Sequence, residues 1–159
     1  MTETRGRMTI EPQGDQFVLG GAIDETAALH EMITRAKNGK LNLDLAAVTF
    51  INSLGVRDWI RFQAAAQQQN ISVQLRRVAE PLVHQLNMII ATRGNALVTS
   101  FYAPYACDAC GREESLLIDA VANGPALVRL EPPPMTCPEC AGPMAFNDFP
   151  ERYFSFLSV

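Results

Sequence analysis

The sequence has no long apolar run and no excess of positive charge. No apolar stretch in its 159 residues approaches the length of roughly 18 residues that a transmembrane helix needs. The first 15 residues lack the apolar core of a secretory signal, so we expect a cytoplasmic protein. The formal net charge is −4, which argues against a protein whose main task is to grip a nucleic-acid backbone.

Familiar catalytic motifs are also absent. The chain contains no G-x-x-x-x-G-K, no G-x-G-x-x-G and no H-E-x-x-H sequence. Its two histidines, His30 and His84, lie in predicted helices, where we expect surface or packed positions. Asp24, Asp44 and Glu80 have structural explanations as a helix cap, a strand-end residue and a helix-start residue. We therefore expect that the protein is not an enzyme.

Four cysteines, all in the last third of the chain, are its most informative residues. They form two C-x-x-C pairs, Cys107 with Cys110 and Cys137 with Cys140, with 26 residues between the pairs. Two intervening residues let both sulfurs of a pair reach one ion, and four thiolates make a closed tetrahedral zinc site. Such a site has no open position for substrate, so the predicted Zn²⁺ is structural. A redox role for the pairs is the alternative, but two pairs flanking a hairpin favour zinc.

The segment between the two pairs predicts a small zinc-ribbon β-hairpin domain. Two strands are expected at Ser115–Val121 and Ala126–Leu130, on either side of a turn at Asn123–Gly124. So short a segment cannot bury enough apolar surface to fold alone, which is why a metal is expected. We expect the apolar tail after the second pair to pack on the ribbon or the sheet, or to contact a partner. Its apolar residues are Met144, Phe146, Phe149, Tyr153, Phe154, Phe156 and Leu157.

The two parts of the chain differ in charge. Residues 1–99 carry ten Lys/Arg and nine Asp/Glu, whereas residues 100–159 carry three and eight. We therefore predict an α/β domain at 1–99 and a zinc-ribbon domain at 100–159, with a boundary near Thr99–Pro104. The acidic balance of the second domain would repel phosphate, so nucleic acid is disfavoured as its partner.

Strand and helix patterns alternate in the first 99 residues. Helices are predicted from Asp24, from Asn52 and from Pro81, where apolar positions recur at helical spacing. The alternation favours an α/β fold with a mixed sheet and helices packed on it. A strand–helix–strand unit that begins near Leu43 makes part of this sheet parallel. The predicted strands are 8–10, 17–19, 41–51, 71–75 and 97–98.

Two motifs lead into predicted helices: LGGAID at 19–24 and LDLAAVTFINSLGV at 43–56. They resemble motifs of the STAS domains, the family that includes the anti-sigma-factor antagonists. The resemblance covers roughly residues 8–98 and agrees with the order of the elements. It implies a STAS-like fold and a regulatory module that binds a protein partner, such as a regulatory kinase or a signalling protein.

The sequence departs from the STAS pattern at one functional position. In many STAS domains, a serine or threonine at the start of the second helix is phosphorylated, and the phosphate releases a bound regulator. Here that position is Leu54, and the family's aspartate is Asn52. Leucine cannot accept a phosphate, so we expect that the usual switch is absent. Ser53 is an alternative acceptor, although capping of the helix by Asn52 or Ser53 is favoured.

The resemblance also implies a partner-binding surface on the loop at 52–55 and on the exposed face of the next helix. Trp59 is either an anchor of this surface or a core residue, and its spacing with Val56 and Ile60 favours the core. Two further functions stay open, a nucleic-acid-associated ribbon protein and a small-molecule or lipid sensor, as does a homodimer. The predicted partner-binding residues are Asn52, Ser53, Leu54, Gly55, Arg57, Asp58 and Arg61.

Overall fold

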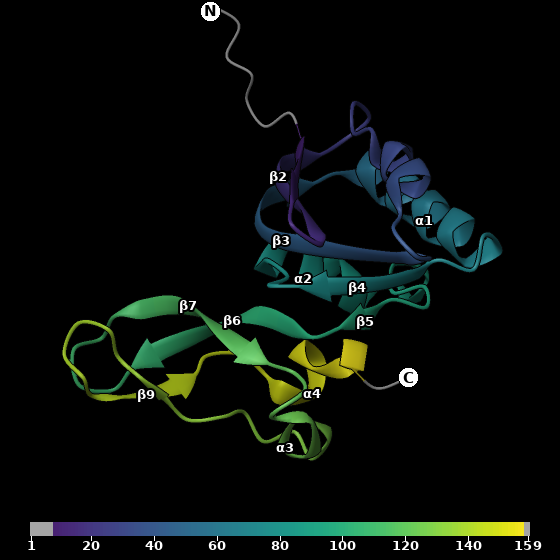
Figure 1. Ribbon diagram of the computed structural model, residues 1–159. Coiled ribbons are helices and arrows are strands. Elements are labelled where there is room, and N and C mark those ends of the chain that lie inside the picture. Colours follow the sequence, from purple (N-terminus) through teal and green to yellow (C-terminus); the bar gives the residue numbers. More distant parts are fainter. Residues whose placement is uncertain (1–7, 158–159) are drawn as a thin grey trace, which may run out of the picture.

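Two β-sheets follow one another along the chain in the computed structural model, which describes residues 8–157 (Figure 1). The first sheet contains, in spatial order, β1 (Thr9–Gln13), β2 (Gln16–Ile23), β3 (Lys40–Ile51), β4 (Ser72–Arg76) and β5 (Leu97–Val98). The second contains β7 (Glu113–Asp119), β6 (Ser100–Cys107), β9 (Pro143–Phe146) and β8 (Met135–Thr136). In the first sheet β1 and β2 form an antiparallel hairpin and all other neighbours are parallel, whereas the second sheet is antiparallel throughout. The predicted α/β class with a mixed sheet is therefore confirmed.

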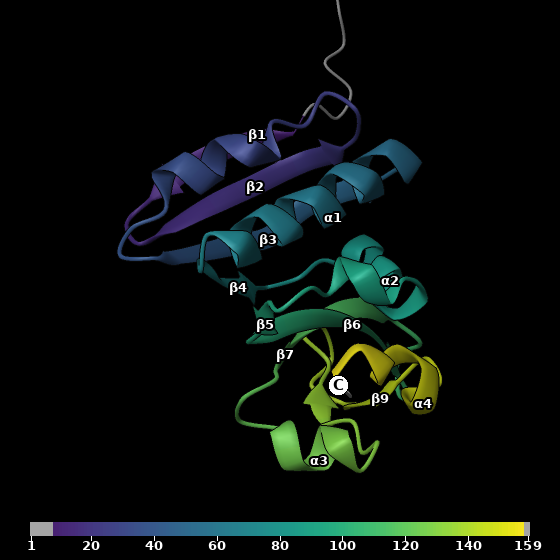
Figure 2. The same ribbon diagram turned by 90° about the vertical axis from the view of Figure 1, so that its right-hand side faces the viewer.

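Helices connect the strands of the first sheet. Figure 2 shows the 3₁₀ helix η1 (Leu29–Arg35) and α1 (Ser53–Gln68) side by side on one face of that sheet. In the part of the chain that the structure describes, no helix is both long and apolar enough to cross a membrane. The remaining helices are α2 (Glu80–Met88), η2 (Ile90–Thr92), α3 (Gly124–Val128), α4 (Pro150–Tyr153) and η3 (Ser155–Leu157).

Helix α1 begins at a polar cap and packs through an apolar face. Asn52 has an extended backbone, and its Oδ1 accepts a hydrogen bond of 2.8 Å from the Gly55 N–H, which satisfies one of the free amides of the first turn. Trp59 is fully buried, and its Nε1–H donates to the Thr92 carbonyl at 2.8 Å. The Asn52 cap and the core position of Trp59 are thus confirmed.

The helix predicted from Asp24 starts later and is a 3₁₀ helix. Ala28 is its N-cap, and no side chain caps it. Asp24 instead accepts a hydrogen bond of 2.8 Å from the Thr26 N–H, so its carboxylate stabilises a local turn before the helix. The prediction that Asp24 caps this helix is therefore wrong, because the nearest free amide lies in the turn.

The prediction of a second strand in the ribbon hairpin, at 126–130, is also wrong. The segment 124–128 forms α3, with Pro125 in its first turn, where the fixed φ of proline suits a helix. The strand predicted at 115–121 is present as β7, but its partner is β6. This part of the chain therefore forms two hairpins, β6–β7, whose loop carries Cys110, and β8–β9, whose loop carries Cys140.

Backbone hydrogen bonds join the two sheets near residue 99. The Thr99 N–H donates to the Leu75 carbonyl in the first sheet, and the Thr99 carbonyl accepts from the Ala120 N–H after β7, both at 2.9 Å. Val78 donates to the Ser100 carbonyl at 3.1 Å and accepts from the Tyr102 N–H at 2.8 Å. The apolar core is continuous from one sheet to the other. The division into two domains, 1–99 and 100–159, stays a prediction.

The aromatic tail packs inside the molecule. Tyr153, Phe154 and Phe156 are buried, and the rings of Phe101 and Phe156 meet edge-to-face at 5.1 Å between centroids. Asn87 of α2 holds the tail in place, because its Nδ2 donates to the Tyr153 carbonyl at 2.9 Å and its Oδ1 accepts from the Phe156 N–H at 2.8 Å. Most of the tail thus packs internally, on the second sheet and on α2, whereas Phe149 is exposed, and a partner contact of the tail stays a prediction.

Replacement of Gly55 by alanine should destabilise the fold by about 3 kcal/mol. A Cβ on Gly55 would lie 1.8 Å from the carbonyl oxygen of Ile23, so α1 would have to move away from β2. The matched control is Gly124→Ala, where a Cβ would meet nothing within 4 Å. Urea unfolding followed by circular dichroism measures both variants. A Gly55→Ala variant as stable as Gly124→Ala would contradict the close contact.

Candidate functional site

Two tight loops of the same shape carry the four cysteines. Each loop begins at a cysteine whose N–H donates to a carbonyl five residues later: Cys107 to Arg112 and Cys137 to Gly142, both at 2.8 Å. The first loop joins β6 to β7, and the second joins β8 to β9. Pairing of β6 with β9 places the loops next to each other.

A residue with left-handed backbone closes each loop. Gly111 has φ 76° and Ala141 has φ 60°, and their N–H groups donate to the carbonyls of Cys107 and Cys137 at 3.0 Å. Glycine adopts this conformation freely, whereas a residue with a Cβ costs about 1–2 kcal/mol. The second loop is therefore more strained than the first.

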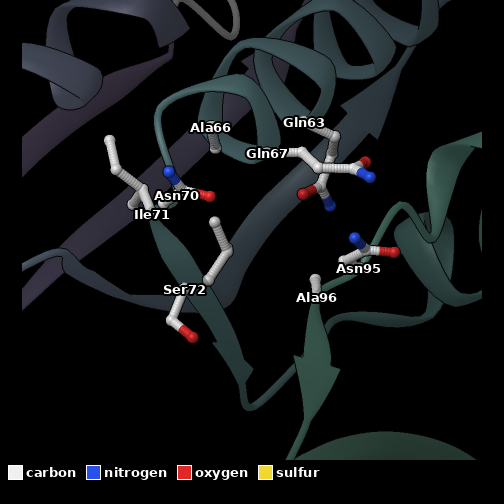
Figure 3. Close-up of a pocket in the computed structure, with 9 residues that line it drawn as sticks. Gln63, Ala66, Gln67, Asn70, Ile71, Ser72, Asn95 and Ala96 are labelled. Carbon is white, nitrogen blue, oxygen red and sulfur yellow. The ribbon is translucent and has the colours of Figure 1, made fainter.

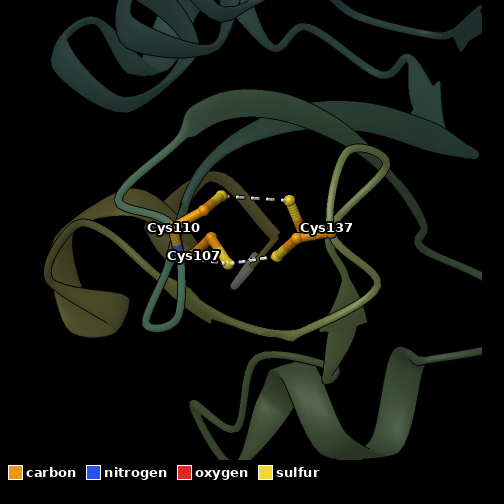
Figure 4. Close-up of side chains that lie close together, drawn as sticks. Cys107, Cys110 and Cys137 are labelled. Carbon is orange, nitrogen blue, oxygen red and sulfur yellow. Dashed lines mark hydrogen bonds between the residues drawn. The ribbon is translucent and has the colours of Figure 1, made fainter.

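The four sulfur atoms converge between the loops (Figure 4). All four Sγ atoms lie within 4.8 Å of one another, and none takes part in a disulfide. Two contacts cross from one loop to the other, Cys107 Sγ to Cys140 Sγ at 3.5 Å and Cys110 Sγ to Cys137 Sγ at 3.7 Å. Four convergent sulfur donors could hold one metal ion, shared by both loops.

Local hydrogen bonding favours the thiolate form of one ligand. The backbone N–H of Cys110 donates to Cys107 Sγ at 3.4 Å and, together with hydrogen bonds from the Ala109 N–H and the neighbouring thiols, lowers the pKa of the Cys107 thiol to about 6. The thiolate is the form of cysteine that binds metals. Near neutral pH, Cys107 is thus prepared to be a ligand.

Further contacts hold the two loops against each other. A Cβ on Gly142 would lie 2.9 Å from the Ala109 Cβ and 3.2 Å from Cys140 Sγ, so the loops meet closely at this glycine. Arg112, which follows the first loop, donates to Glu139 of the second at 3.1 Å. That ion pair is exposed and adds little stability, so close packing and the four sulfurs do most to join the loops.

The predicted partner-binding residues lie at the start of α1. Leu54 is 41% exposed, and the side chains of Arg57 and Arg61 are also exposed. Asp58 lies 3.6 Å from Arg57 Nε and 4.0 Å from Arg61 Nη1. Gly55 is buried against β2 and contributes to the position of the helix rather than to its surface.

One exposed residue beside this surface was missed in the sequence. Phe50 is 54% exposed near the end of β3, where a buried strand was predicted. The pairing of β2 with β3 shifts register between Gly21 and Ala22, the partner of Phe50, and this irregularity breaks the inward–outward alternation. No pattern within 43–51 reveals it, because the shift depends on the neighbouring strand.

The remaining polar residues named from the sequence do not form a common site. His30 is exposed on η1, and His84 is exposed with its ring edge-on to Tyr153 at 5.9 Å. Asp44 is buried in β3 and pairs with Arg77 at 3.4 Å. These three residues thus lie in different parts of the fold, and their contacts are with different partners.

A separate hollow of about 280 Å³ lies beside the end of α1 (Figure 3). Polar side chains from α1 and from the segment before β5 surround it, and all of its lining residues are uncharged. It is therefore not a site for acid–base chemistry. The polar lining residues are Gln63, Gln67, Asn70, Ser72 and Asn95.

No model of a known protein family matches this chain, and no curated protein matches it. The resemblance to STAS domains therefore stays a prediction, which rests on the motifs at 19–24 and 43–56 and on the order of the elements.

Substitution of Ala141 by glycine and of Gly111 by alanine, the two residues with left-handed backbone, should change the stability of the protein in opposite directions. Ala141→Gly should stabilise the protein by about 0.5–1 kcal/mol, because it removes strain at φ 60°. Gly111→Ala should destabilise it by about 1 kcal/mol, because it introduces that strain at φ 76° while a Cβ meets nothing within 4 Å. Thermal unfolding at a fixed zinc concentration measures both. If both variants shifted the unfolding temperature in the same direction, the two loops would not share the left-handed backbone at these positions.

Proposed function

We propose that the protein is a non-enzymatic regulatory module that binds a protein partner. Its STAS-like half docks on the partner through residues 52–61, and its second half is a ribbon held by a structural Zn²⁺. The observation that carries the proposal is the exposure of Leu54 at the start of α1, four residues after Phe50, a second exposed apolar residue. Leu54 has no hydroxyl group, so the proposed module works without the phosphorylation switch of its STAS counterparts.

The geometry and chemistry of the sulfur cluster suit Zn²⁺ better than Mg²⁺ or Ca²⁺. With Zn–S bonds of about 2.3 Å, the sulfurs of a tetrahedral site lie about 3.8 Å apart. The two contacts between the loops, at 3.5 Å and 3.7 Å, are close to that separation. Soft thiolate donors select zinc over magnesium or calcium. Cys107, Cys110, Cys137 and Cys140 would hold the ion, whose role is to tie the β6–β7 loop to the β8–β9 loop.

The chemistry of the 52–61 surface indicates the kind of partner. Leu54 and Phe50 supply apolar area, and Arg57 and Arg61 lie one and two turns further along α1. Apolar anchors with a charged rim are typical of protein interfaces, where charge sets orientation and association rate. A partner with an apolar pocket bordered by carboxylates would match this surface.

Removal of zinc should loosen the second half of the protein first. We expect one zinc per chain in gently purified protein, measured by elemental analysis and native mass spectrometry. After chelation, hydrogen exchange should rise in residues 100–146, because the two loops lose their shared ion. Trp59, the only tryptophan, lies in the core of the first sheet, so its fluorescence should change less. Metal-free protein with four freely reactive thiols would contradict the zinc site and favour the redox alternative.

Leu54→Asp should abolish partner binding and leave the fold intact. A carboxylate in the first turn of α1 is favourable by about 0.3–1 kcal/mol, so lost binding cannot be attributed to unfolding. Proteins cross-linked to native and variant chains in cells are compared by quantitative mass spectrometry. The control is Val128→Asp, which places the same charge on an exposed apolar residue of α3. A partner lost with Leu54→Asp and kept with Val128→Asp supports the proposal, and an unchanged set of partners contradicts it.

A further inference from the structure

Both lysines of the chain lie on a single turn. Lys37 and Lys40 flank the turn between η1 and β3, and their N–H groups donate to each other's carbonyls at 3.2 Å and 3.0 Å. Asn38 and Gly39 between them have left-handed backbone, with φ 54° and 70°. The preceding 3₁₀ helix ends at Arg35, and these two residues form the tight turn that follows it. The backbone that carries both ammonium groups is therefore well defined.

Two arginines with restrained positions lie at the same end of the first sheet. Arg35 stacks over the Phe17 ring, with Cζ 4.8 Å from its centroid. Arg76 Nη1 donates to Gln16 Oε1 at 3.2 Å and lies 3.6 Å from Asp15 Oδ1. Both guanidinium groups are thus oriented before any ligand arrives, which lowers the entropy cost of binding one.

These four side chains surround two hollows, of about 330 and 440 Å³. Lys37, Lys40, Asp15 and Asn42 line both, while Arg35 lines the first and Arg76 the second. Figure 2 shows the β1–β2 turn and the link from η1 to β3 together at the left end of the first sheet. We call this group the cationic end: Arg35, Lys37, Lys40 and Arg76.

Charge at the cationic end is opposite to that of the whole chain. Four cations meet one carboxylate, Asp15, in a protein of net charge −4. Among residues 8–157, no carboxylate forms an ion pair with Arg35, Lys37 or Lys40. Their charge is thus available to a ligand.

We propose that the cationic end binds a small anion with two or more phosphate groups, such as inorganic pyrophosphate or the phosphate chain of a nucleotide. Lysine and arginine together supply point charges and forked donors for phosphate oxygens. Two hollows that share lining residues accommodate neighbouring phosphate groups. A short anion contacts only the cationic end, whereas a long polyanion such as nucleic acid would also meet the acidic remainder of the protein.

The proposed anion site is independent of the proposed partner surface. Lys40 is the first residue of β3 and Ile51 is the last, so this 12-residue strand separates the cationic end from Asn52. An extended strand of that length spans roughly 35–40 Å. Loss of one site therefore leaves the other in place.

Isothermal titration of the zinc-loaded full chain with pyrophosphate tests the proposal. Native protein should bind pyrophosphate more tightly than orthophosphate, and Lys37→Gln with Lys40→Gln should weaken binding about tenfold or more. Arg57→Gln with Arg61→Gln removes the same charge from α1 and should change the affinity less than about twofold. Because the chain has only these two lysines, pyrophosphate should also slow amine labelling at both.

The outcomes separate the proposal from its alternatives. ADP that binds as well as pyrophosphate indicates recognition of the phosphate chain alone, and tighter ADP binding indicates a nucleotide ligand; both support the site. Absence of binding at low ionic strength overturns it. Equal losses in the two double variants would show diffuse charge attraction instead of a site. Tighter, lysine-dependent binding of a single-stranded oligonucleotide would overturn the small-anion assignment.

Discussion

Strand β6 is the element on which both halves of the molecule depend. Alternate residues along it, Phe101, Ala103, Tyr105 and Cys107, are buried on one face. At its start, β6 bonds to Val78 beside the first sheet, and at its end it places Cys107 in the sulfur cluster. The apolar packing of the first half and the sulfur cluster of the second therefore meet opposite ends of one strand. Any shift of its register would move every inward side chain to the other face.

The second half of the chain folds by combining two weak sources of stability. Its sheet is small and would bury little apolar area alone. The tail compensates in part, because Tyr153 donates its hydroxyl hydrogen to the Tyr102 carbonyl at 2.6 Å and packs with Phe154 against Phe101. Burial accordingly raises the pKa of the Tyr153 hydroxyl far above its ordinary value. The sulfur cluster then joins two loops at the edge of the apolar core, since Cys107 and Cys137 are buried whereas Cys110 and Cys140 are exposed.

Strand β3 separates two surfaces of different chemistry. Its amino end carries Lys40 and the cationic end, and its carboxyl end leads through Phe50 into the apolar start of α1. A small anion and a protein partner could thus occupy the same molecule without contact between them. Gly55 matters to the second surface, because its lack of a side chain lets α1 approach the Ile23 carbonyl.

Local chemistry in the sequence determined much of this protein. The Asn52 cap, the Pro81 start of α2, the strands of the first sheet and the pairing of cysteines at C-x-x-C spacing all follow from short-range rules, since each involves residues a few positions apart. Tertiary structure alone decided the rest. Residues 126–128 of the predicted strand lie in α3 instead, while β7 pairs with β6, and Phe50 faces outward because β2 shifts register against β3. The cationic end joins residues up to 41 positions apart in sequence, from Arg35 to Arg76, and only the packing of separate elements brings such residues together.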